Sequence, residues 1–475
     1  MASAAEQLAS NLSFKTFQKA TDLKKRIWFT LACLIVYRLG TYIPIPGINP
    51  EAFARAFEQQ SQGVLGLLNV FAGGAVERLA IFALGIMPYI SASIIMQLMT
   101  SVVPTLEQLK KDGESGRKVI NQYTRYATVV LATAQAYGIA AGLNGSGDPA
   151  AGGFVVDPGW FFIFTTVVTL VGGTMFLMWL GEQITARGIG NGISLIIFAG
   201  IVAALPGAIV QLLEASRTGA LSPLVMILVL ISVVLLIAFI VFMERAQRRV
   251  LIQYPSRQKG NKMTKGDSSH LPLKLNTAGV IPPIFASSLL LLPATITGFA
   301  GDAAAGDGVL GYVNALFGRG QPGYLLAYAG MIAFFAFFYT AIVFNPKETA
   351  TNLRQHGGFI PGIRPGDRTA EYIDYVLTRI TVLGALYLVF VCLLPEMFLT
   401  NLGISAFLGG TSLLIVVSVT LDTVNQVQGH LFAQQYEGLI AKSKLRKGKR
   451  SNNTPIAPTA PRGGVTGGGR GRGRR

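Results

Sequence analysis

Long apolar stretches constrain this chain more than any other feature. A helix needs about 20 mostly apolar residues to cross the hydrocarbon core of a membrane. The sequence contains ten such stretches, at roughly 27–43, 79–99, 126–142, 160–180, 189–212, 222–243, 277–298, 324–344, 376–396 and 404–422. Only 13% of the residues are charged, whereas about 25% is usual in a soluble domain. The sequence therefore predicts an all-α polytopic membrane protein with ten transmembrane helices.

The distribution of Lys and Arg predicts how the spans are oriented, because short cytoplasmic loops retain basic residues. Of the 40 Lys and Arg residues, 35 lie in the two terminal segments and in the loops on the same side of the membrane. Arg38 lies inside the first span, and the opposite side holds only Arg55, Arg78, Arg217 and Arg319. Both termini are therefore expected in the cytoplasm. The first 26 residues are polar and rich in Lys, so no cleavable signal peptide is expected.

The two terminal segments lie outside the spans. Residues 1–26 form a cytoplasmic segment, in which 11–25 could be an interfacial amphipathic helix or only a charged anchor for the first span. Residues 425–475 form a cytoplasmic tail, and from about residue 451 its low complexity is typical of a disordered arm. The Arg-Gly ending could contact ribosomal RNA or anionic lipid headgroups, or it could simply be solvated.

Ten spans divide into two halves of five, 27–213 and 222–424, and an odd number per half inverts the second half relative to the first. Weakened spans at matching positions of inverted halves are the best indication of a transport pathway. Here the second and fifth spans of each half carry Gly or Pro, at Gly85, Pro88, Gly188, Gly190, Gly192, Gly279, Pro282, Pro283, Gly403, Gly409 and Gly410. Close helix packing would explain any one of them. Together they predict a pathway between the halves, walled by spans two, five, seven and ten.

Signs of catalysis and of ion coupling are missing from the sequence. It has no P-loop and no HExxH motif, and its three His residues are not spaced as metal ligands. Ion-coupled transporters keep paired ionisable residues at mid-membrane, whereas these spans carry few. We therefore expect no enzyme activity, no metal and no cofactor, and we expect a partner to supply energy. A secondary transporter for a small solute and an intramembrane enzyme remain the alternatives.

Five segments of the chain form a recognisable set of motifs, namely IFALGIMPYISASIIMQL, GIGNGISLIIFAGI, HLPLKLNTAGVIPPIFASS, GGFIPGIRPGDRTAEYI and GGTSLLIVVSVTLD. In this order they resemble the SecY family of protein-conducting channels. The resemblance covers about residues 20 to 440. It implies a central hourglass pore through which unfolded secretory proteins cross the bacterial cytoplasmic (inner) membrane. It also implies a lateral gate through which membrane proteins enter the lipid.

The resemblance further implies how the pore is sealed. A ring of aliphatic side chains would narrow it, at Ile86, Ile90, Ile197, Ile201, Ile284 and Ile415. A plug of about residues 63–74 would close the outward side, with Phe71 near its end and a hinge at Gly73 and Gly74. Two of the isoleucine pairs have the i,i+4 spacing of one helix face. Without the resemblance, packing in a helix bundle would explain these isoleucines better.

The lateral gate would lie between spans two and seven, at Pro88, Ser91, Pro282 and Ser287. Gly and Pro within these spans would let the two helices bend or separate at low cost.

The cytoplasmic loops 244–276 and 345–375 would bind the ribosome or the motor ATPase SecA, through Arg364, Arg248, Arg249 and Arg257. Arg364 stands between Gly-Pro turn elements, which project a side chain from a hairpin tip. Other partners implied by the resemblance are small membrane subunits similar to SecE and SecG, signal sequences, nascent or unfolded polypeptides and membrane lipid, but not DNA. The role of Glu77, just past the plug, stays open.

Overall fold

The structure is a computed structural model. It describes residues 21–60, 69–144, 155–219, 222–255, 257–259, 262–264, 268–299, 321–402 and 409–451. Most of the N-terminal segment, plug residues 63–68 and the Arg-Gly ending therefore lie outside the described residues. Contacts divide the chain into a large unit, Lys24–Gln426, and a small unit made of Met1–Leu23 and Val427–Arg475. Apart from the ends of the first and last helices, all elements lie in the large unit.

Each predicted span overlaps a helix. In chain order these are α3 (Thr21–Gly40), α6 (Met87–Val102), α8 (Glu114–Asn144), α9 (Trp160–Arg187), α10 (Gly192–Arg217), α11 (Pro223–Arg245), α12 (Ile281–Phe299), α14 (Pro322–Val343), α16 (Asp367–Leu402) and α17 (Gly410–Ser451). Shorter helices lie between some of them, namely α4 (Pro50–Gln60), α7 (Pro104–Lys111) and α15 (Pro346–Gln355). The all-α class predicted from the sequence is confirmed.

Not all of these helices are long and apolar enough by themselves to cross a membrane. Among the described residues seven are, and α6 with α7, bent by 98° at their junction, would make eight. Helix α3 has no stretch of 18 residues with so few charges, because Lys24, Lys25, Arg26 and Arg38 lie in each such stretch of the helix. Side chains of α12 are described only as far as Leu290, which leaves a shorter apolar helix.

Local sequence explains several helix starts. Asn191, Ser222 and Asn345 cap α10, α11 and α15, because each side chain accepts a hydrogen bond from a backbone N–H of the first turn. A proline follows the cap of α11 and of α15. At that position the missing N–H has no intrahelical partner to lose.

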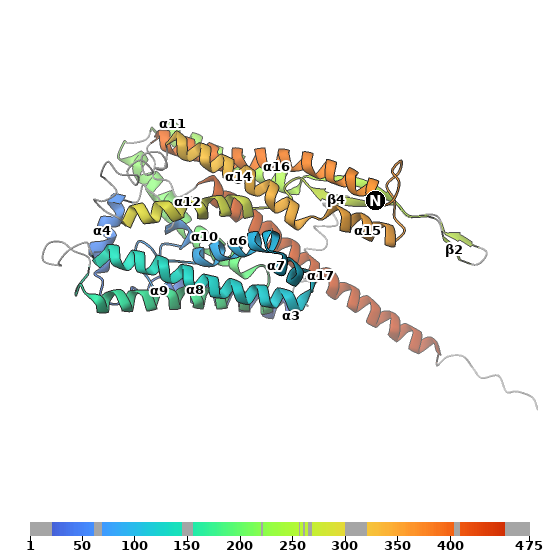
Figure 1. Ribbon diagram of the computed structural model, residues 1–475, viewed down its shortest axis with the longest axis horizontal. Helices are drawn as coiled ribbons and strands as arrows, with labels where there is room; N and C mark the ends of the chain where they lie inside the picture. Colours follow the sequence, from blue (N-terminus) through green and yellow to red (C-terminus); the bar gives the residue numbers. More distant parts are fainter. Residues whose placement is uncertain are drawn as a thin grey trace, which may run out of the picture. The chain divides into compact units, whose positions relative to one another are not determined.

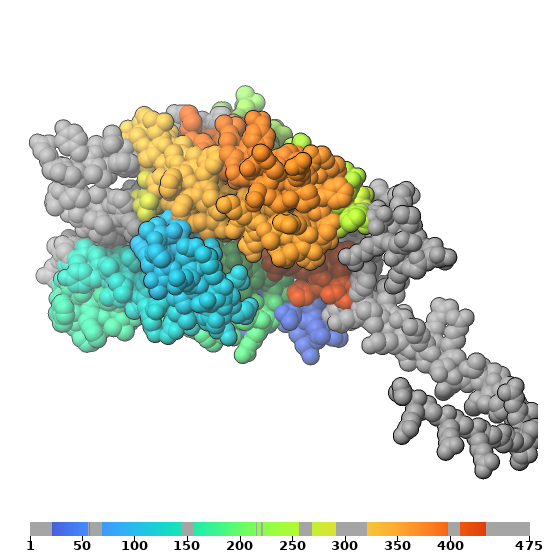
Figure 2. Space-filling view, turned by 45° about the vertical axis from the view of Figure 1, so that its right-hand side comes forward, coloured from blue at the N-terminus to red at the C-terminus, as the bar shows by residue number. Residues whose placement is uncertain are grey.

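The helices of each half pack mainly on one another. Helix α8 packs on α6 and α9, and α9 on α10, while α14 packs on α12 and α16. Figure 1 shows α8 and α9, in cyan to green, as one layer, and α12, α14 and α16, in yellow to orange, as another. The layers meet where α12 contacts α6 and α8, and Figure 2 shows the two colour ranges lying against each other.

The chain between α11 and α12 forms a long hairpin. Strand β1 (Gln247–Gln253) pairs antiparallel with β4 (Ser268–Lys274), and β2 (Arg257–Lys259) pairs with β3 (Lys262–Thr264). In β1, buried and exposed residues alternate from Arg249 to Gln253, as expected for a half-buried strand. At its end Gln253 exchanges two backbone hydrogen bonds with Phe359, of 2.9 and 3.0 Å. The two predicted docking loops are thus joined.

Candidate functional site

The second span starts later than its hydropathy suggests. The sequence predicts a helix over 79–99, but α6 begins only at Met87, after a succession of turns. Backbone hydrogen bonds of 2.9 and 3.0 Å instead join residues 79–81 to residues 43–45, which follow α3. An apolar run indicates burial, and this segment is buried without being helical.

The prolines of spans two and seven mark where the helices begin. Pro88 lies in the first turn of α6, and Pro282 and Pro283 are the second and third residues of α12. Backbone N–H groups of a first turn have no intrahelical acceptor, so a proline there removes no hydrogen bond. The prediction that these prolines weaken the interior of the two spans is therefore wrong.

The starts of α6 and α12 share a sequence pattern. Residues 84–93, LGIMPYISAS, and residues 278–287, AGVIPPIFAS, have Gly, Pro, Ile, Ala and Ser at the same spacing. The glycine has a positive φ in both, +57° at Gly85 and +64° at Gly279, a conformation that favours glycine. In both, the helix begins two residues after that glycine. This repeat was not predicted, although its pattern is visible in the sequence.

Glycines of neighbouring helices make room for the backbone just before each start. A Cβ at Gly173 of α9 would collide with the carbonyl oxygen of Ile81, and a Cβ at Gly384 of α16 would lie 2.8 Å from the carbonyl oxygen of Leu275. Ile81 and Leu275 both stand four residues before the positive-φ glycine. Spans four and nine therefore match as well, which supports a division into two halves of five.

The predicted ring isoleucines come together in one apolar cluster. Five of them are buried members of this cluster, namely Ile86, Ile90, Ile197, Ile201 and Ile415, and the partly buried Ile284 packs against the cluster.

Part of this cluster lines a cavity of about 10 Å³, near the smallest size that holds one water molecule. Its isoleucines are Ile86, Ile90, Ile197 and Ile284, and Phe71 and Ala72 line it too. Ile201 and Ile415 belong to the cluster but are not among the lining residues. The end of the predicted plug therefore lies against the predicted ring.

Helices α6 and α12 contact each other, as predicted for the two sides of a gate. Ser91 and Ser287 are buried, but the Ser287 hydroxyl donates within its own helix, to the carbonyl oxygen of Ile284 at 3.0 Å. Among the side chains that the structure describes, a polar contact between the helices comes from the next serine, Ser288, whose Oγ lies 3.9 Å from Sδ of Met87. A bond to a thioether is weak, so this contact adds little polar attraction to the described part of the helix pair.

The predicted hinge glycines end a short helical turn, residues 69–71. Gly73 and Gly74 have φ values of +66° and +85°. The Gly73 N–H donates to the carbonyl oxygen of Val70 at 3.2 Å, and the Gly74 N–H donates to that of Asn69 at 2.9 Å. This pair of bonds defines a Schellman motif, the usual way for a helix to end in a glycine.

Two side chains of α3 hold the same turn. The Tyr37 hydroxyl donates to the carbonyl oxygen of Ala72 at 3.2 Å, and the Arg38 guanidinium donates to the carbonyl oxygen of Gly73. Arg38 and Arg78 both lie over the ring of Tyr42, at 5.0 and 4.3 Å from its centroid. The two hydrogen bonds to the turn were not predicted, because Tyr37 and Arg38 each lie 35 residues from the carbonyl that accepts.

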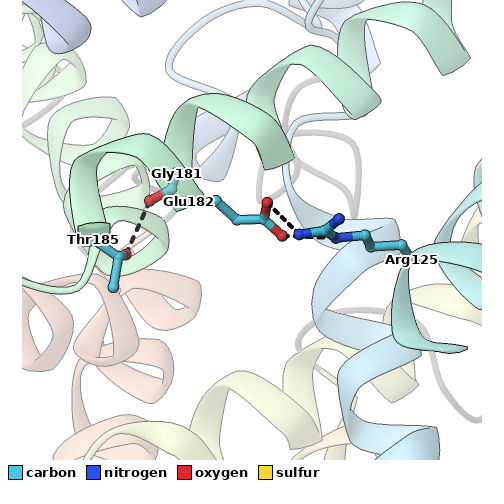
Figure 3. Close-up of polar contacts among 4 residues, drawn as sticks. All are labelled: Arg125, Gly181, Glu182 and Thr185. Atoms are coloured by element: carbon cyan, nitrogen blue, oxygen red, sulfur yellow. Dashed lines mark hydrogen bonds and ion pairs between the residues drawn. The ribbon is translucent and has the colours of Figure 1, made fainter. Parts of the chain in front are cut away.

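An ion pair joins α8 to α9 (Figure 3). Nε and Nη2 of Arg125 donate to the two carboxylate oxygens of Glu182, at 3.0 and 2.7 Å. The Thr185 hydroxyl donates to the carbonyl oxygen of Gly181 and accepts from the N–H of Gly192, both at 2.9 Å. The first residue of α10 is thereby tied to α9. These contacts orient the helix that carries two of the ring isoleucines.

The predicted docking arginines stand on a packed base. Arg364, Arg248 and Arg249 are exposed, and Arg257 lies in β2, where the structure describes the backbone only. The Thr369 hydroxyl donates to the carbonyl oxygen of Arg364 at 2.9 Å and so fixes its turn. Beneath them the joined loops and α16 share a small apolar core of Val250, Leu273, Ile360, Ile373 and Ile380.

Comparisons with known proteins point to one family. The SecY family model matches residues 80–424. The chain is 54% identical over 439 residues to the protein translocase subunit SecY of Rickettsia conorii, covering 92% of this chain and 100% of that relative.

Solved structures give the same fold. One is a structure of SecY, described by the role of its plug domain in stabilising the closed channel and keeping a membrane seal. It matches with a TM-score of 0.60 and 19% identity, over 86% of this chain and 92% of that one. The canine Sec61 of a ribosome-channel complex matches with a TM-score of 0.59 and 18% identity, over the same shares of the two chains.

Proposed function

The chain belongs to the SecY family, and we propose that it is the channel subunit of a bacterial protein translocase. It conducts unfolded secretory proteins across the cytoplasmic membrane and releases membrane proteins sideways into the lipid. One observation carries this proposal: Phe71 and Ala72, at the end of the plug, line the same narrow cavity as isoleucines from three helices, α6, α10 and α12.

The isoleucine cluster is the seal of the closed channel. Aliphatic side chains can close a pore by dewetting, and they offer no hydrogen bonds that would hold a passing polypeptide. A cavity of about 10 Å³ leaves no room for a hydrated ion. Passage requires that the plug leave and that the six isoleucines spread around the moving chain.

The lateral gate lies between α6 and α12, in two inverted halves of the chain, residues 27–213 and 222–424. Pro88, Ser91, Pro282 and Ser287 line it. The contact between Ser288 and Met87 at 3.9 Å is weak, so separating this part of the helix pair breaks little besides apolar packing. A hydrophobic signal sequence or membrane helix replaces that packing as it enters.

The basic loops face the cytoplasm, together with both termini, and bind the partner that drives transport. Support comes from the distribution of charge, since 35 of the 40 Lys and Arg residues lie on this side. The ribosome or SecA binds at Arg364, Arg248, Arg249 and Arg257. Small membrane subunits similar to SecE and SecG complete the channel.

The test is ATP-dependent movement of a secretory precursor into liposomes that contain this chain, its small subunits and SecA. Arg364→Glu should lower the transport rate at least about tenfold, because it reverses a charge at the docking surface. Arg55→Glu makes the same charge change on the opposite side of the membrane and should leave the rate unchanged. Absence of transport by the wild type would refute the proposal. Full transport by Arg364→Glu would remove only this arginine from the docking surface.

A further inference from the structure

The turn that ends the plug is closed by a pair of side chains. The buried Asn69, only 3% exposed, accepts a hydrogen bond through Oδ1 from the backbone N–H of Glu77 at 3.0 Å. Through Nδ2 it donates to Oε2 of Glu77 at 3.3 Å. Two hydrogen bonds therefore join Asn69 to Glu77 across the loop that contains both predicted hinge glycines.

The two arms of this loop are held by different parts of the chain. The arm that follows Glu77 is held by the backbone bonds of residues 79–81 to residues 43–45. The arm that contains Asn69 is the end of the plug, and its helical turn stops at Gly73. In the proposed channel the plug opens about Gly73 and Gly74, and Asn69 then moves with the plug while Glu77 stays beside residues 79–81. The bonds between them then have to break.

Helices α3 and α10 define where the closed turn sits. Tyr37 donates to the carbonyl oxygen of Ala72 at 3.2 Å. On α10, a Cβ added to Gly200 would lie 3.0 Å from the carbonyl oxygen of Phe71 and 3.2 Å from the N–H nitrogen of Gly73. Gly200 therefore provides a notch into which the turn fits. These contacts locate the turn, whereas the bonds of Asn69 to Glu77 hold it shut from within.

We propose that Glu77 is a positioning residue of the plug, and that its clasp with Asn69 sets how often the resting channel opens. This inference rests on the proposed function, because it assumes that residues 63–74 are the plug. A hydrogen bond to a carboxylate, made by a buried donor, is strong enough for its loss to shift the open-to-closed ratio about tenfold or more.

The experiment exchanges the two polar groups. Asn69→Asp has nearly the same shape, but it removes the amide donor and sets a second carboxylate against Glu77. The double variant Asn69→Asp with Glu77→Gln restores an amide and a carboxylate with their positions reversed, and the backbone N–H of residue 77 keeps its acceptor. The readout is the ion conductance of the resting channel, with its small subunits, in planar bilayers without signal sequence or SecA.

We expect Asn69→Asp to raise the resting conductance about tenfold, and the double variant to return it to within about twofold of wild type. Rescue by exchange excludes misfolding as the cause, and equal thermal unfolding midpoints of the three complexes provide a second check. Glu51→Gln is the matched control, since its carboxylate is exposed on α4, 4.0 Å from Arg55, and it should leave the conductance unchanged.

An unchanged conductance in Asn69→Asp, or a double variant that leaks as much as Asn69→Asp, would overturn the clasp. The same preparations, assayed for transport of a precursor with SecA and ATP, separate this result from failure of the proposed function. Transport by the wild type without any effect of Asn69→Asp on conductance removes the clasp only. If the wild type neither transports nor opens with a signal sequence, the proposed function fails as well.

Discussion

Three residues before its positive-φ glycine, the start of α6 carries Phe82, whereas the start of α12 carries Asn276. Phe82 is 3% exposed and stacks between Tyr37 and Phe176, with ring centroids 6.2 and 5.9 Å away. Asn276 instead donates to Oε1 of Glu244 at 2.7 Å and to the carbonyl oxygen of Gly279 at 3.1 Å. The two helix starts repeat a backbone design but not the contacts that hold it.

The same backbone geometry is thus held by aromatic packing at the start of α6 and by hydrogen bonds at the start of α12. Packing is non-directional and depends on volume, so the aromatic stack holds the start of α6 firmly against α3 and α9. A hydrogen bond to a carboxylate is directional and is lost as a unit when its geometry is disturbed. In the proposed channel, the α6 side is the fixed frame beside the plug. The α12 side instead depends on a hydrogen bond whose loss is abrupt.

The largest effect is expected when the aromatic anchor of α6, Phe82, is removed. Phe82→Ala should lower the free energy of unfolding by about 3–5 kcal/mol, because it leaves a cavity between α3 and α9. Unfolding of the purified complex in mixed detergent micelles measures the change. Phe161→Ala, at a side chain that is 78% exposed on α9, is the matched control, expected within about 0.5 kcal/mol of wild type. A loss below about 1 kcal/mol for Phe82→Ala would mean that the stack does not anchor α6.

Removing the polar anchor should have a smaller effect. Asn276→Ala deprives the Glu244 carboxylate of a donor, at a cost of about 1.5–3 kcal/mol. The same unfolding measurement, made as a double-mutant cycle with Glu244→Gln, isolates the pair. Ser269→Ala, at an exposed position of β4, is the control and should cost less than about 0.5 kcal/mol. Independent, additive effects of the Asn276 and Glu244 substitutions would show that the bond does not hold α12.

Hydropathy located the spans well because it indicates which residues are buried. It failed at the start of α6 because burial alone does not show whether the backbone is helical. Residues 79–86 are as apolar as a helix, yet they form turns, and Leu79 and Ile81 bond through their backbones to residues 43–45. Gly85, three residues before Pro88, was the signal for a later start. The same spacing recurs at Gly279 and would have revealed the repeat if the two segments had been compared.

The ring isoleucines could be named only from the family resemblance, with which the i,i+4 spacing of two pairs agrees, and the structure gathers them in one cluster. Tyr37, Arg38 and Asn69 could not. Tyr37 and Arg38 each bond to a carbonyl 35 residues away. No periodicity or motif links residues at such a separation, since only the folded chain brings α3 against the plug turn. Contacts of this kind depend on tertiary structure and leave no local trace.

The glycines that receive the two carbonyls offer a finer test of the repeat. Gly173→Ala should destabilise by about 1–3 kcal/mol, because its Cβ would collide with backbone that cannot move as a side chain does. Gly384→Ala should cost less, since its Cβ would meet the carbonyl oxygen of Leu275 at 2.8 Å. Gly172→Ala is the control, with nothing within 4 Å of its Cβ. The free energies of unfolding of the three variant complexes, measured in one detergent, rank the substitutions. A larger loss of stability for Gly172→Ala than for Gly173→Ala would contradict the packing.

The smallest effect is expected at the prolines, where the two starts should behave alike. Pro88 and Pro282 occupy first turns, so Ala in their place restores an N–H without creating a new intrahelical bond. The change is limited to the entropy that Pro removes from the unfolded chain, about 0.4–1 kcal/mol, and precursor transport should stay within about twofold of wild type. Transport by Pro88→Ala and Pro282→Ala, measured beside their stabilities, tests this. A large loss of transport at unchanged stability, for either proline, would mean that it acts in gate opening. The two helix starts would then differ in mechanism as well as in their anchors.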